Sequence, residues 1–319
     1  MTVLSFEPAD TAWVMIQTVS ADQSLMPAPA ATPAELYFPA LSATPALTTV
    51  PALKPRFQAE VGHYRLRLAE TEADREAVCR LRFRVFNIEL GEGLESSYQT
   101  GLDTDEFDSC CEHLLVEDRE SGRAVGTYRM QSGLTAGRHH GYYSAREFCF
   151  GPYEPLRPEV LELGRASIDR EHRTPEVLTL LWRGIAQYAT DKGLRYLIGC
   201  SSLNSKDPAE GWAMYDLLRA YRCQPEFETE TTAEFACPTE HRDQATQTAG
   251  PEESQPLAQE APNPVKVPKL LKTYLTIGAR IAAPPAWDRA FGTIDFLTLL
   301  DLRTISSSAR NRFLAPLAR

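Results

Sequence analysis

Two charged side chains in an apolar segment are the residues of this sequence best suited to do chemistry. Glu162 and Arg165 lie in VLELGRASI (160–168), whose other side chains are apolar or small. An unpaired charge buried in such a segment costs several kcal/mol, so charges there normally pair, line a pocket or point outward. Burial would also raise the pKa of the Glu162 carboxyl, which suits a group that accepts a proton. We predict that the pair faces a cleft; the alternative is an ion pair on a surface edge strand.

The segment that carries this pair has the apolar, turn-bounded composition of a strand in the middle of a sheet. A separation of three residues places Glu162 and Arg165 on opposite faces of a regular strand. Gly164 lies between them, and a glycine inside a strand often marks a β-bulge that re-aims a side chain. The sequence therefore predicts a bulge at Gly164, followed by a short arginine-bearing turn and an amphipathic helix that runs to Asp191.

Strands and helices alternate along the chain on both sides of this segment. Thr71 and Asp74 have the spacing of a helix N-cap and its partner, which marks the start of the first predicted helix. The alternation predicts an α/β sandwich with a mixed sheet. The predicted strands are 64–69, 113–118, 124–132, 160–168, 195–203 and 295–302, and the predicted helices are 71–86, 175–191, 207–222 and 267–281.

Composition divides the chain into a tail and one domain. Residues 1–57 are rich in Ala and Pro without a sustained period, which predicts a disordered tail. Residues 58–319 are the expected domain. Within it, residues 224–263 carry nine acidic residues against one basic residue and are rich in Thr, Gln and Pro. This composition predicts a flexible acidic insertion.

The charge of the chain limits its partners. The net charge of −10 argues against a general nucleic-acid-binding protein. Residues 264–319 nevertheless carry nine basic residues against three acidic ones. Such a patch could meet an acidic protein or an anionic membrane surface, and an ordinary solvated surface is the open alternative.

The cysteines and the hydropathy of the chain indicate its compartment. The seven cysteines show neither CxxC spacing nor pairing with histidines, and their number is odd. This favours reduced thiols over a disulfide framework or a metal site, and we expect no bound metal. Because no apolar run reaches about 18 residues and no secretory signal is recognisable, we expect a cytoplasmic protein, soluble or peripheral to a membrane. Cys200, inside the apolar run LIGCSSL, is expected to be a packed residue and not an acyl-accepting nucleophile.

Seven charged or aromatic residues follow one another in an order that resembles a known family. They are Arg82, Phe86, Asp105, Asp108, Arg129, Glu162 and Arg165. The order is similar to the charged constellation of bacterial N-acylhomoserine lactone synthases, a branch of the GNAT acyltransferase superfamily. The segment 267–302, together with LWRGIAQYA and LIGCSS, looks instead like the ornithine-acyl-carrier-protein N-acyltransferases that make lyso-ornithine lipid, and like the related N-acyl amino acid synthases. The resemblance covers roughly residues 62–223 and 266–303 and implies a GNAT-like three-layer α/β/α sandwich with a mixed central sheet.

The resemblance implies transfer of a fatty acyl group, in some relatives 3-hydroxylated, to the α-amine of an amino acid, with ornithine as the expected acceptor. The implied donor is the phosphopantetheine thioester of acyl carrier protein, and no tightly bound cofactor is expected. A thioester needs no enzyme nucleophile if a neutral amine is held against it, because proximity alone can lower the barrier by about 7 to 11 kcal/mol.

The resemblance also suggests a role for each residue. Glu162 would take the proton from the amine, directly or through water, and Arg165 would orient Glu162 or bind the substrate carboxylate. Five further residues would contact the substrate: Arg82, Phe86, Asp105, Asp108 and Arg129. The two aspartates would supply negative charge for an ammonium group, whereas the arginines would order the acidic loop or the substrate.

The sequence departs from relatives at the place where GNAT acetyltransferases carry a glycine-rich pyrophosphate loop. Here that place holds DREHRTPEV (169–177), which argues against coenzyme A as the main donor. Acyl carrier protein is acidic, so Arg170, Arg173 and Arg183 could attract it, although they could equally be solvent-facing residues. The tryptophan that autoinducer synthases place after their first helix is absent from ELGEGLES (89–96).

Two other functions stay open from the sequence. One is an N-acylhomoserine lactone synthase that uses S-adenosylmethionine, which the missing tryptophan and the C-terminal segment disfavour. The other is a non-catalytic module that binds acyl carrier protein or the inner membrane.

Overall fold

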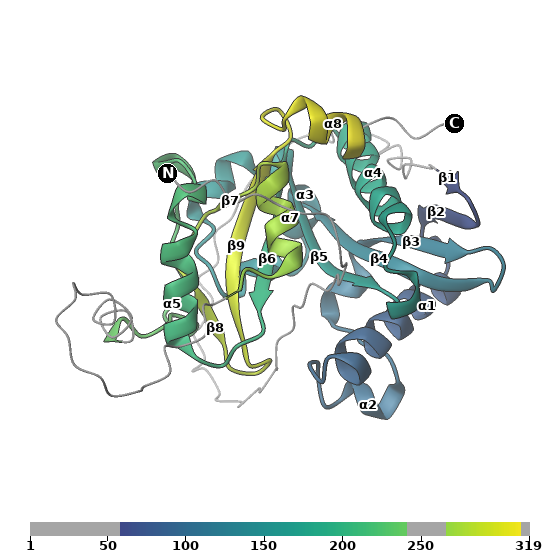
Figure 1. Cartoon of the computed structure of the whole chain (residues 1–319), viewed down its shortest axis with the longest axis horizontal. Coiled ribbons are helices and arrows are strands. Elements are labelled where there is room, and N and C mark those ends of the chain that lie inside the picture. Colours follow the sequence, from purple (N-terminus) through teal and green to yellow (C-terminus); the bar gives the residue numbers. More distant parts are fainter. Residues whose placement is uncertain (1–57, 241–265, 314–319) are drawn as a thin grey trace, which may run out of the picture.

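The computed structural model describes residues 58–240 and 266–313, and the predicted disordered tail lies outside them. A nine-stranded mixed sheet forms the centre of the molecule, with helices on both faces (Figure 1). The strand order is β1-β2-β3-β4-β5-β6-β9-β7, and β8 also pairs with β9. The strands are β1 Gln58–Val61, β2 Tyr64–Leu68, β3 Glu112–Asp118, β4 Arg123–Ser132, β5 Val160–Ile168, β6 Tyr196–Leu203, β7 Arg280–Ile281, β8 Ala286–Asp288 and β9 Thr293–Asp301.

Different helices pack on the two faces of the central sheet. Helix α4 packs its apolar side on β2, β3 and β4, with α7 beside it, and these elements share the largest core cluster of the protein. Helix α1 packs on the opposite face, against β3, β4 and β5. The α-helices are α1 Glu72–Phe83, α2 Ser97–Thr100, α3 Gly133–Arg138, α4 Pro175–Lys192, α5 Pro208–Leu217, α7 Lys269–Ile277 and α8 Ser307–Phe313. A π-helical turn, Arg84–Glu89, continues α1, and short 3-10 turns lie at Glu106–Ser109, Tyr143–Arg146, Gly151–Glu159, Arg170–His172, Arg219–Tyr221 and Pro225–Phe227.

The local signals in the sequence explain where the two main helices begin and end. Thr71 caps α1 and exchanges hydrogen bonds with Asp74, which is the predicted capping box. Thr174 caps α4, Pro175 occupies its first turn, and Gly193 ends it in the left-handed conformation that glycine adopts without strain. All the predicted strands and helices therefore exist, within a few residues of the predicted bounds.

The predicted bulge in β5 is present, but it falls one residue later than expected. Arg129 pairs with Gly164 and Thr127 pairs with Ser167, so one residue of β4 faces two residues of β5, Arg165 and Ala166. Arg165 itself takes the left-handed conformation, with φ of 51°, which costs about 1 kcal/mol or more for a residue with a Cβ. The prediction that Gly164 is the bulged residue was therefore wrong by one position. The bulge directs the Arg165 side chain toward the same region of the fold as Glu162.

The flexible insertion expected over residues 224–263 is wrong for its first part. Residues 224–240 lie on the body of the protein, where the amides of Thr229 and Thr232 donate to the carbonyls of Ala282 and Glu147. Trp212 also donates its indole N–H to the carbonyl of Pro238. These hydrogen bonds explain why an acidic, Pro-containing segment is ordered against the body of the protein. The remainder of the predicted insertion lies outside the described residues.

Strands β5 and β6 are the one parallel pair in the described sheet, and their pairing is short. It covers Val160–Glu162 and Tyr196–Ile198, although both strands continue further. Just beyond this ladder, a Cβ placed on Gly199 would lie 2.3 Å from the carbonyl oxygen of Leu163. Only glycine fits here, because the two backbones approach each other closely before they separate.

No helix in the described part of the chain is both long and apolar enough to cross a membrane.

Replacement of Gly199 by alanine tests this close approach. We expect Gly199→Ala to lower the free energy of unfolding by about 1 to 3 kcal/mol, because the new methyl group must displace backbone. Gly137→Ala is the matched control, since its Cβ would meet only the flexible end of the Arg157 side chain. Denaturant melts of both variants measure the difference. Equal stability of the two variants would contradict the geometry described for β5 and β6.

Candidate active site

A buried network of arginines and aspartates lies against β5. Arg82 on α1 donates from Nε to Oδ1 of Asp103 (2.7 Å) and from Nη1 and Nη2 to the two oxygens of Asp108 (2.7 and 2.8 Å). Arg129 on β4 donates from Nη1 to Asp105 (2.6 Å) and more weakly to Asp108 (3.3 Å). The fork of a guanidinium matches a carboxylate in this way and makes the strongest of the charge-assisted hydrogen bonds.

Arg165 completes the network. Its Nη2 lies 3.5 Å from Asp105, and its Nε lies 3.5 Å from Asp103. The arginine–aspartate network thus holds three arginines (Arg82, Arg129 and Arg165) and three aspartates (Asp103, Asp105 and Asp108). Five of these residues are buried, and the side chain of the sixth, Asp105, is 6% exposed. The three positive and three negative charges of the network cancel, which offsets the free-energy cost of removing them from water.

The network accounts for the acidity of its carboxyls. Burial alone would raise the pKa of Asp108, but the guanidiniums of Arg82 and Arg129 hold it well below its usual range. Asp105 also has a lowered pKa, again against the effect of burial, because Arg129 and Arg165 lie beside it. Both carboxylates are therefore charged and already neutralised by arginines, with Arg82 and Arg129 ordering the acidic loop. Direct contact between these aspartates and a substrate ammonium remains a prediction.

Phe86 and Tyr143 enclose the Arg165 guanidinium. Its central carbon lies 5.7 Å from the centre of the Phe86 ring and 6.0 Å from that of Tyr143. Arg165 is fully buried, and its Nη1 has no hydrogen-bond partner in the described residues. Aromatic faces stabilise a cation, but they leave its N–H groups free to donate. Arg165 can therefore still bind an anionic group.

An ion pair between Glu162 and Arg165 was one alternative from the sequence, and the structure does not contain it. The two carboxylate oxygens of Glu162 accept hydrogen bonds from the backbone N–H groups of Tyr143 and Ser144, each at 2.8 Å. Burial raises the pKa of Glu162, and these two amide donors only partly oppose the shift. A carboxylate has about four acceptor positions. The structure thus holds Glu162 in a fixed orientation while positions for further donors remain.

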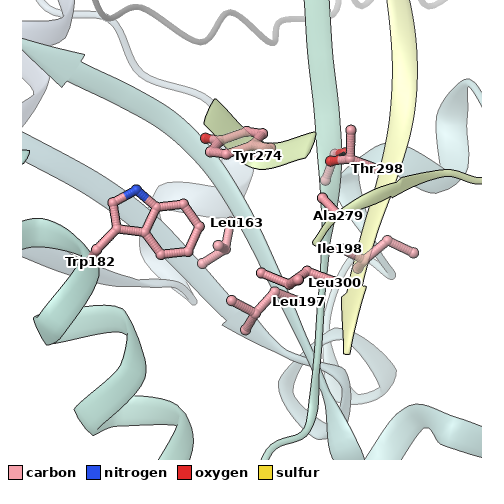
Figure 2. Close-up of a pocket in the computed structure, with 9 residues that line it drawn as sticks. Leu163, Trp182, Leu197, Ile198, Tyr274, Ala279, Thr298 and Leu300 are labelled. Atoms are coloured by element: carbon pink, nitrogen blue, oxygen red, sulfur yellow. Dashed lines mark hydrogen bonds between the residues drawn. The ribbon is translucent and has the colours of Figure 1, made fainter. Parts of the chain in front are cut away.

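A small apolar pocket of about 20 Å³, room for about one water molecule, lies beside the β5–β6 ladder (Figure 2). Leu163 and Leu197 reach it from the two strands, Trp182 from α4 and Tyr274 from α7. Leu163 belongs to the core on the α4 face of the sheet, whereas Glu162, its neighbour in the strand, points to the other face. The pocket and the Glu162 carboxylate therefore lie on opposite sides of the sheet at the place where the strands cease to pair.

Four buried carboxyls next to this region were not singled out from the sequence. They are Glu92, Glu147, Asp288 and Asp295, and they are called the acid cluster below. Carboxylate oxygens of Glu147, Asp288 and Asp295 lie within 4.8 Å of one another, a spacing that could hold a cation. Asp295 lies in the apolar strand TIDFLTLLD, so the reasoning applied to Glu162 could have found it. Glu147 lies in an irregular turn, where no sequence pattern distinguishes it from a surface acid.

The three arginines expected to meet acyl carrier protein have different surroundings. Arg170 is exposed at a surface hollow of about 960 Å³ near the start of α4. Arg173 binds Glu89 through two hydrogen bonds of 2.6 Å, which joins the turn before α4 to the end of the π-helical turn. Arg183 is half-buried in the middle of α4. Arg170 is therefore the one of the three that the structure leaves most accessible to a partner.

The cysteines agree with the expectation of free thiols. None of the seven forms a disulfide. Cys200 is fully buried, and burial raises its pKa well above the ordinary value, so it is a packed thiol and a poor nucleophile.

Comparison with known proteins identifies the class to which this fold and site belong. A family model described as an acetyltransferase (GNAT) domain matches residues 81–183, which include the end of α1, the acidic loop, β4, β5 and the first half of α4. The protein is an acyltransferase with a GNAT-type fold, as predicted. A solved N-acyl amino acid synthase from uncultured soil microbes is 12% identical, with a TM-score of 0.41, and covers 79% of this chain and 95% of its own.

The sequence comparison defines the family more closely. The L-ornithine N(alpha)-acyltransferase of Brucella abortus (strain 2308) is 33% identical over 261 residues, which are 77% of this chain and 87% of that protein. This chain belongs to the L-ornithine N(alpha)-acyltransferase family, so the predicted resemblance is confirmed. An acyl-homoserine-lactone synthase of Vibrio anguillarum is 30% identical over only 101 residues, 32% of this chain and 50% of that protein.

Removal of Arg82 tests the charge balance of the network. We expect Arg82→Met to lower the free energy of unfolding by about 3 to 5 kcal/mol, because Asp103 and Asp108 would be left buried without their main partner. Arg80→Met, two residues earlier, removes an exposed pair with Glu76 and should change stability by less than about 0.5 kcal/mol. Chemical denaturation measures both. A loss of similar size in the two variants would contradict the assigned role.

Proposed function

We propose that this protein transfers a fatty acyl group from the thioester of acyl carrier protein to the α-amine of ornithine, which yields a lyso-ornithine lipid. Family membership supports the acceptor, since the curated relatives bear the name L-ornithine N(alpha)-acyltransferase. The observation that carries the proposal is the position of Glu162. Its carboxylate lies at the end of the β5–β6 ladder, next to a strand residue that lines the apolar pocket.

The lining of the apolar pocket is suited to an acyl chain, and its side chains would have to move apart to admit one. Its lining is apolar except for a few polar atoms such as the Thr298 hydroxyl, which already donates to the carbonyl of Gly199. Transfer of each methylene group from water into such surroundings is favourable by about 0.8 kcal/mol. The thioester would then sit where β5 and β6 separate, with the amine approaching from the face on which Glu162 lies.

Glu162 is suited to accept the proton that the amine must lose. The amine enters as an ammonium, transfers one proton to Glu162 directly or through water, and its nitrogen lone pair then attacks the thioester carbonyl carbon. The C–N bond forms and the C–S bond breaks. The nitrogen then gives up a second proton, the pantetheine sulfur takes up one proton and leaves as a thiol, and Glu162 returns its proton to solvent. The raised pKa of the buried Glu162 carboxyl brings it nearer to the operating pH, where a general base works best.

Arg165 is suited to hold the α-carboxylate of the acceptor. Its unpartnered Nη1 is buried beside Phe86 and Tyr143, and the buried Tyr143 hydroxyl also has no hydrogen-bond partner in the described residues. A carboxylate placed there would receive charge-assisted hydrogen bonds in a water-poor setting. This contact would fix the α-amine, which is bonded to the same carbon, with respect to Glu162.

The start of α4 supports a carrier-protein donor more than free coenzyme A. Thr174 Oγ1 accepts from the Val177 N–H, Pro175 supplies no N–H, and Glu176 adds a negative charge in the first turn. These features disfavour a pyrophosphate at this helix terminus. Arg84, Arg123 and Arg170 line the hollow beside it together with Glu89, Asp169 and Glu171, and Arg84 and Arg123 both pair with Asp169. An acidic carrier protein could bind there mainly through Arg170.

Glu162→Gln tests the proposed base. The variant keeps the shape and one of the two backbone contacts, because its amide nitrogen cannot accept the second N–H. It also cannot accept the proton, so we expect kcat to fall about 100- to 10,000-fold at neutral pH. The assay measures acyl-ornithine formed from acyl-acyl-carrier protein by mass spectrometry. A cooperative thermal melt shows that the variant is folded. Unchanged kcat in a folded Glu162→Gln protein would exclude Glu162 as the base.

Charge reversal at Arg170 tests the donor surface. We expect Arg170→Glu to raise KM for the acyl carrier protein substrate about tenfold, with a smaller effect at high salt, because such contacts are screened. Arg219→Glu is the control, since Arg219 is also exposed but lies beyond α5. Equal KM values for the two variants would place the carrier protein elsewhere.

A further inference from the structure

The acid cluster contains four buried carboxyls that do not pair with a positively charged side chain of the described residues. Glu147 and Asp295 are at most 1% exposed, Asp288 is 2% exposed, and Glu92 is 8% exposed. No lysine or arginine in the described chain lies within ion-pair distance of any of the four, although Arg165 acts on Asp288 from further away. The arginine–aspartate network is neutral by itself. Four buried carboxyls therefore remain without a positive partner.

Glu147 is the least satisfied member of the cluster. No group in the described residues donates a hydrogen bond to either of its oxygens, and one oxygen of Asp295 is in the same condition. Glu147 and Asp295 can bond to each other only if one of them keeps a proton, and the Ser202 hydroxyl is a further partner of Asp295. Asp288 differs, since its Oδ1 accepts from the N–H groups of Ala290 and Phe291 and so holds the turn before β9.

Burial and repulsion between neighbouring carboxyls raise the pKa values of the acid cluster. The pKa of Asp295 is raised to about 7, first by burial and then by Asp288, and the pKa of Glu147 is raised well above its usual range by burial and by Asp295. Burial, followed by Asp295, also raises the pKa of Glu92 to about 7. Without a cation, the cluster must therefore hold protons near neutral pH. A buried positive charge would replace them.

The cluster adjoins the Glu162 carboxylate. Cys200 lies in the field of Glu147, Asp295 and Glu162 together, so all three surround one position of β6. Glu147 ends the same short turn, Tyr143–Arg146, whose first amides bind Glu162. The Thr293 and Ser144 hydroxyls are also fully buried here. Base, arginine and acid cluster thus border one polar region inside the fold.

Glu92 connects this region to the surface. It lines a hollow of about 610 Å³ between the loops Gly91–Gly93 and Trp287–Gly292, and it acts electrostatically on Asp295 further in. Lys206 and Arg289 also line this hollow, but neither lies within ion-pair distance of the cluster. Glu92 is therefore the member of the cluster that lies nearest to solvent.

We propose that Glu147 and Asp295 bind the side-chain ammonium of the acceptor and so select a diamino acid. This inference rests on the proposed function and adds the residues that would distinguish ornithine from an amino acid with an apolar side chain. The ammonium supplies the missing positive charge and up to three N–H donors for oxygens that otherwise have none. Arg165 holds the α-carboxylate at the other end, with the α-amine at Glu162 between them.

The test compares L-ornithine with L-norvaline, which has the same carbon chain but no side-chain amine. With full-length protein and acyl-acyl-carrier protein, we expect wild-type kcat/KM to favour ornithine at least about 100-fold. Glu147→Gln and Asp295→Asn should each lower kcat/KM for ornithine at least about tenfold and change that for norvaline less than about threefold. Asp118→Asn is the control, because Asp118 is a buried carboxylate at the far hairpin of β3. It should leave both values unchanged.

A second measurement separates recognition from structural support. In the absence of substrate, Glu147→Gln and Asp295→Asn should melt at or above the wild-type temperature at pH 8, because each removes an unpaired buried charge. Ornithine at saturating concentration should raise the wild-type melting temperature and raise that of the variants much less. Lower melting temperatures of both variants, or equal losses of activity toward ornithine and norvaline, would overturn the inference.

Two further outcomes are distinguishable. If Mg²⁺ or Mn²⁺ stabilises the wild type but not Glu147→Gln, and chelation abolishes the preference for ornithine, the cluster is a metal site and the inference is wrong. If the wild type acylates neither amino acid, the proposed function fails. In that case, ornithine binding measured by calorimetry still supports or rejects the assignment of Glu147 and Asp295.

Discussion

Charge buried in the middle of the sheet is the constraint on which the rest of the structure depends. Arg82, Arg129 and Arg165 come from three elements, and the loop that contains Asp103, Asp105 and Asp108 meets all of them. None of these charges could be buried alone, since an uncompensated ion in the interior costs several kcal/mol. The loop is therefore fixed to α1, β4 and β5 by its charges, where a loop without regular structure would otherwise be mobile. It closes one side of the polar region that contains Glu162.

The acid cluster differs from the arginine–aspartate network in how its buried charges are satisfied. The network is satisfied within the protein, whereas both oxygens of Glu147 and one oxygen of Asp295 lack donors in the described chain. Natural proteins tolerate such unfavourable burial mainly where function requires it. A site that is incomplete without a positively charged ligand gains affinity and selectivity for that ligand, and it loses some stability when the ligand is absent. The proposed ammonium contact is an interaction of this kind.

The central sheet separates the apolar and polar halves of the candidate active site. Leu163 and Glu162 are neighbours in β5, so the pleat sends one side chain to the α4 face and the other to the opposite face. The short β5–β6 ladder and the absence of a side chain at Gly199 set the place where the two halves can communicate. The bulge at Arg165 then brings a second charge to the polar side. An acyl chain and a charged amino acid need opposite environments, and the two faces of one sheet supply them.

The sequence by itself was enough to predict the main strands and helices, the family and most of the charged residues that lie in the candidate active site. Apolar runs, the Thr71–Asp74 cap and the order of charges from Arg82 to Arg165 are local properties, and they predicted the α/β sandwich correctly. The roles assigned to the seven candidate site residues stay predictions. The tertiary structure alone decided their partners. It assigned Glu162 to two backbone amides, put the bulge on Arg165, fixed residues 224–240 to the body, and brought Glu147 and Asp295 together across about 150 residues of chain. The physical reason is that hydrogen bonds and desolvation depend on distances between elements far apart in sequence, and a pattern along the chain does not contain those distances.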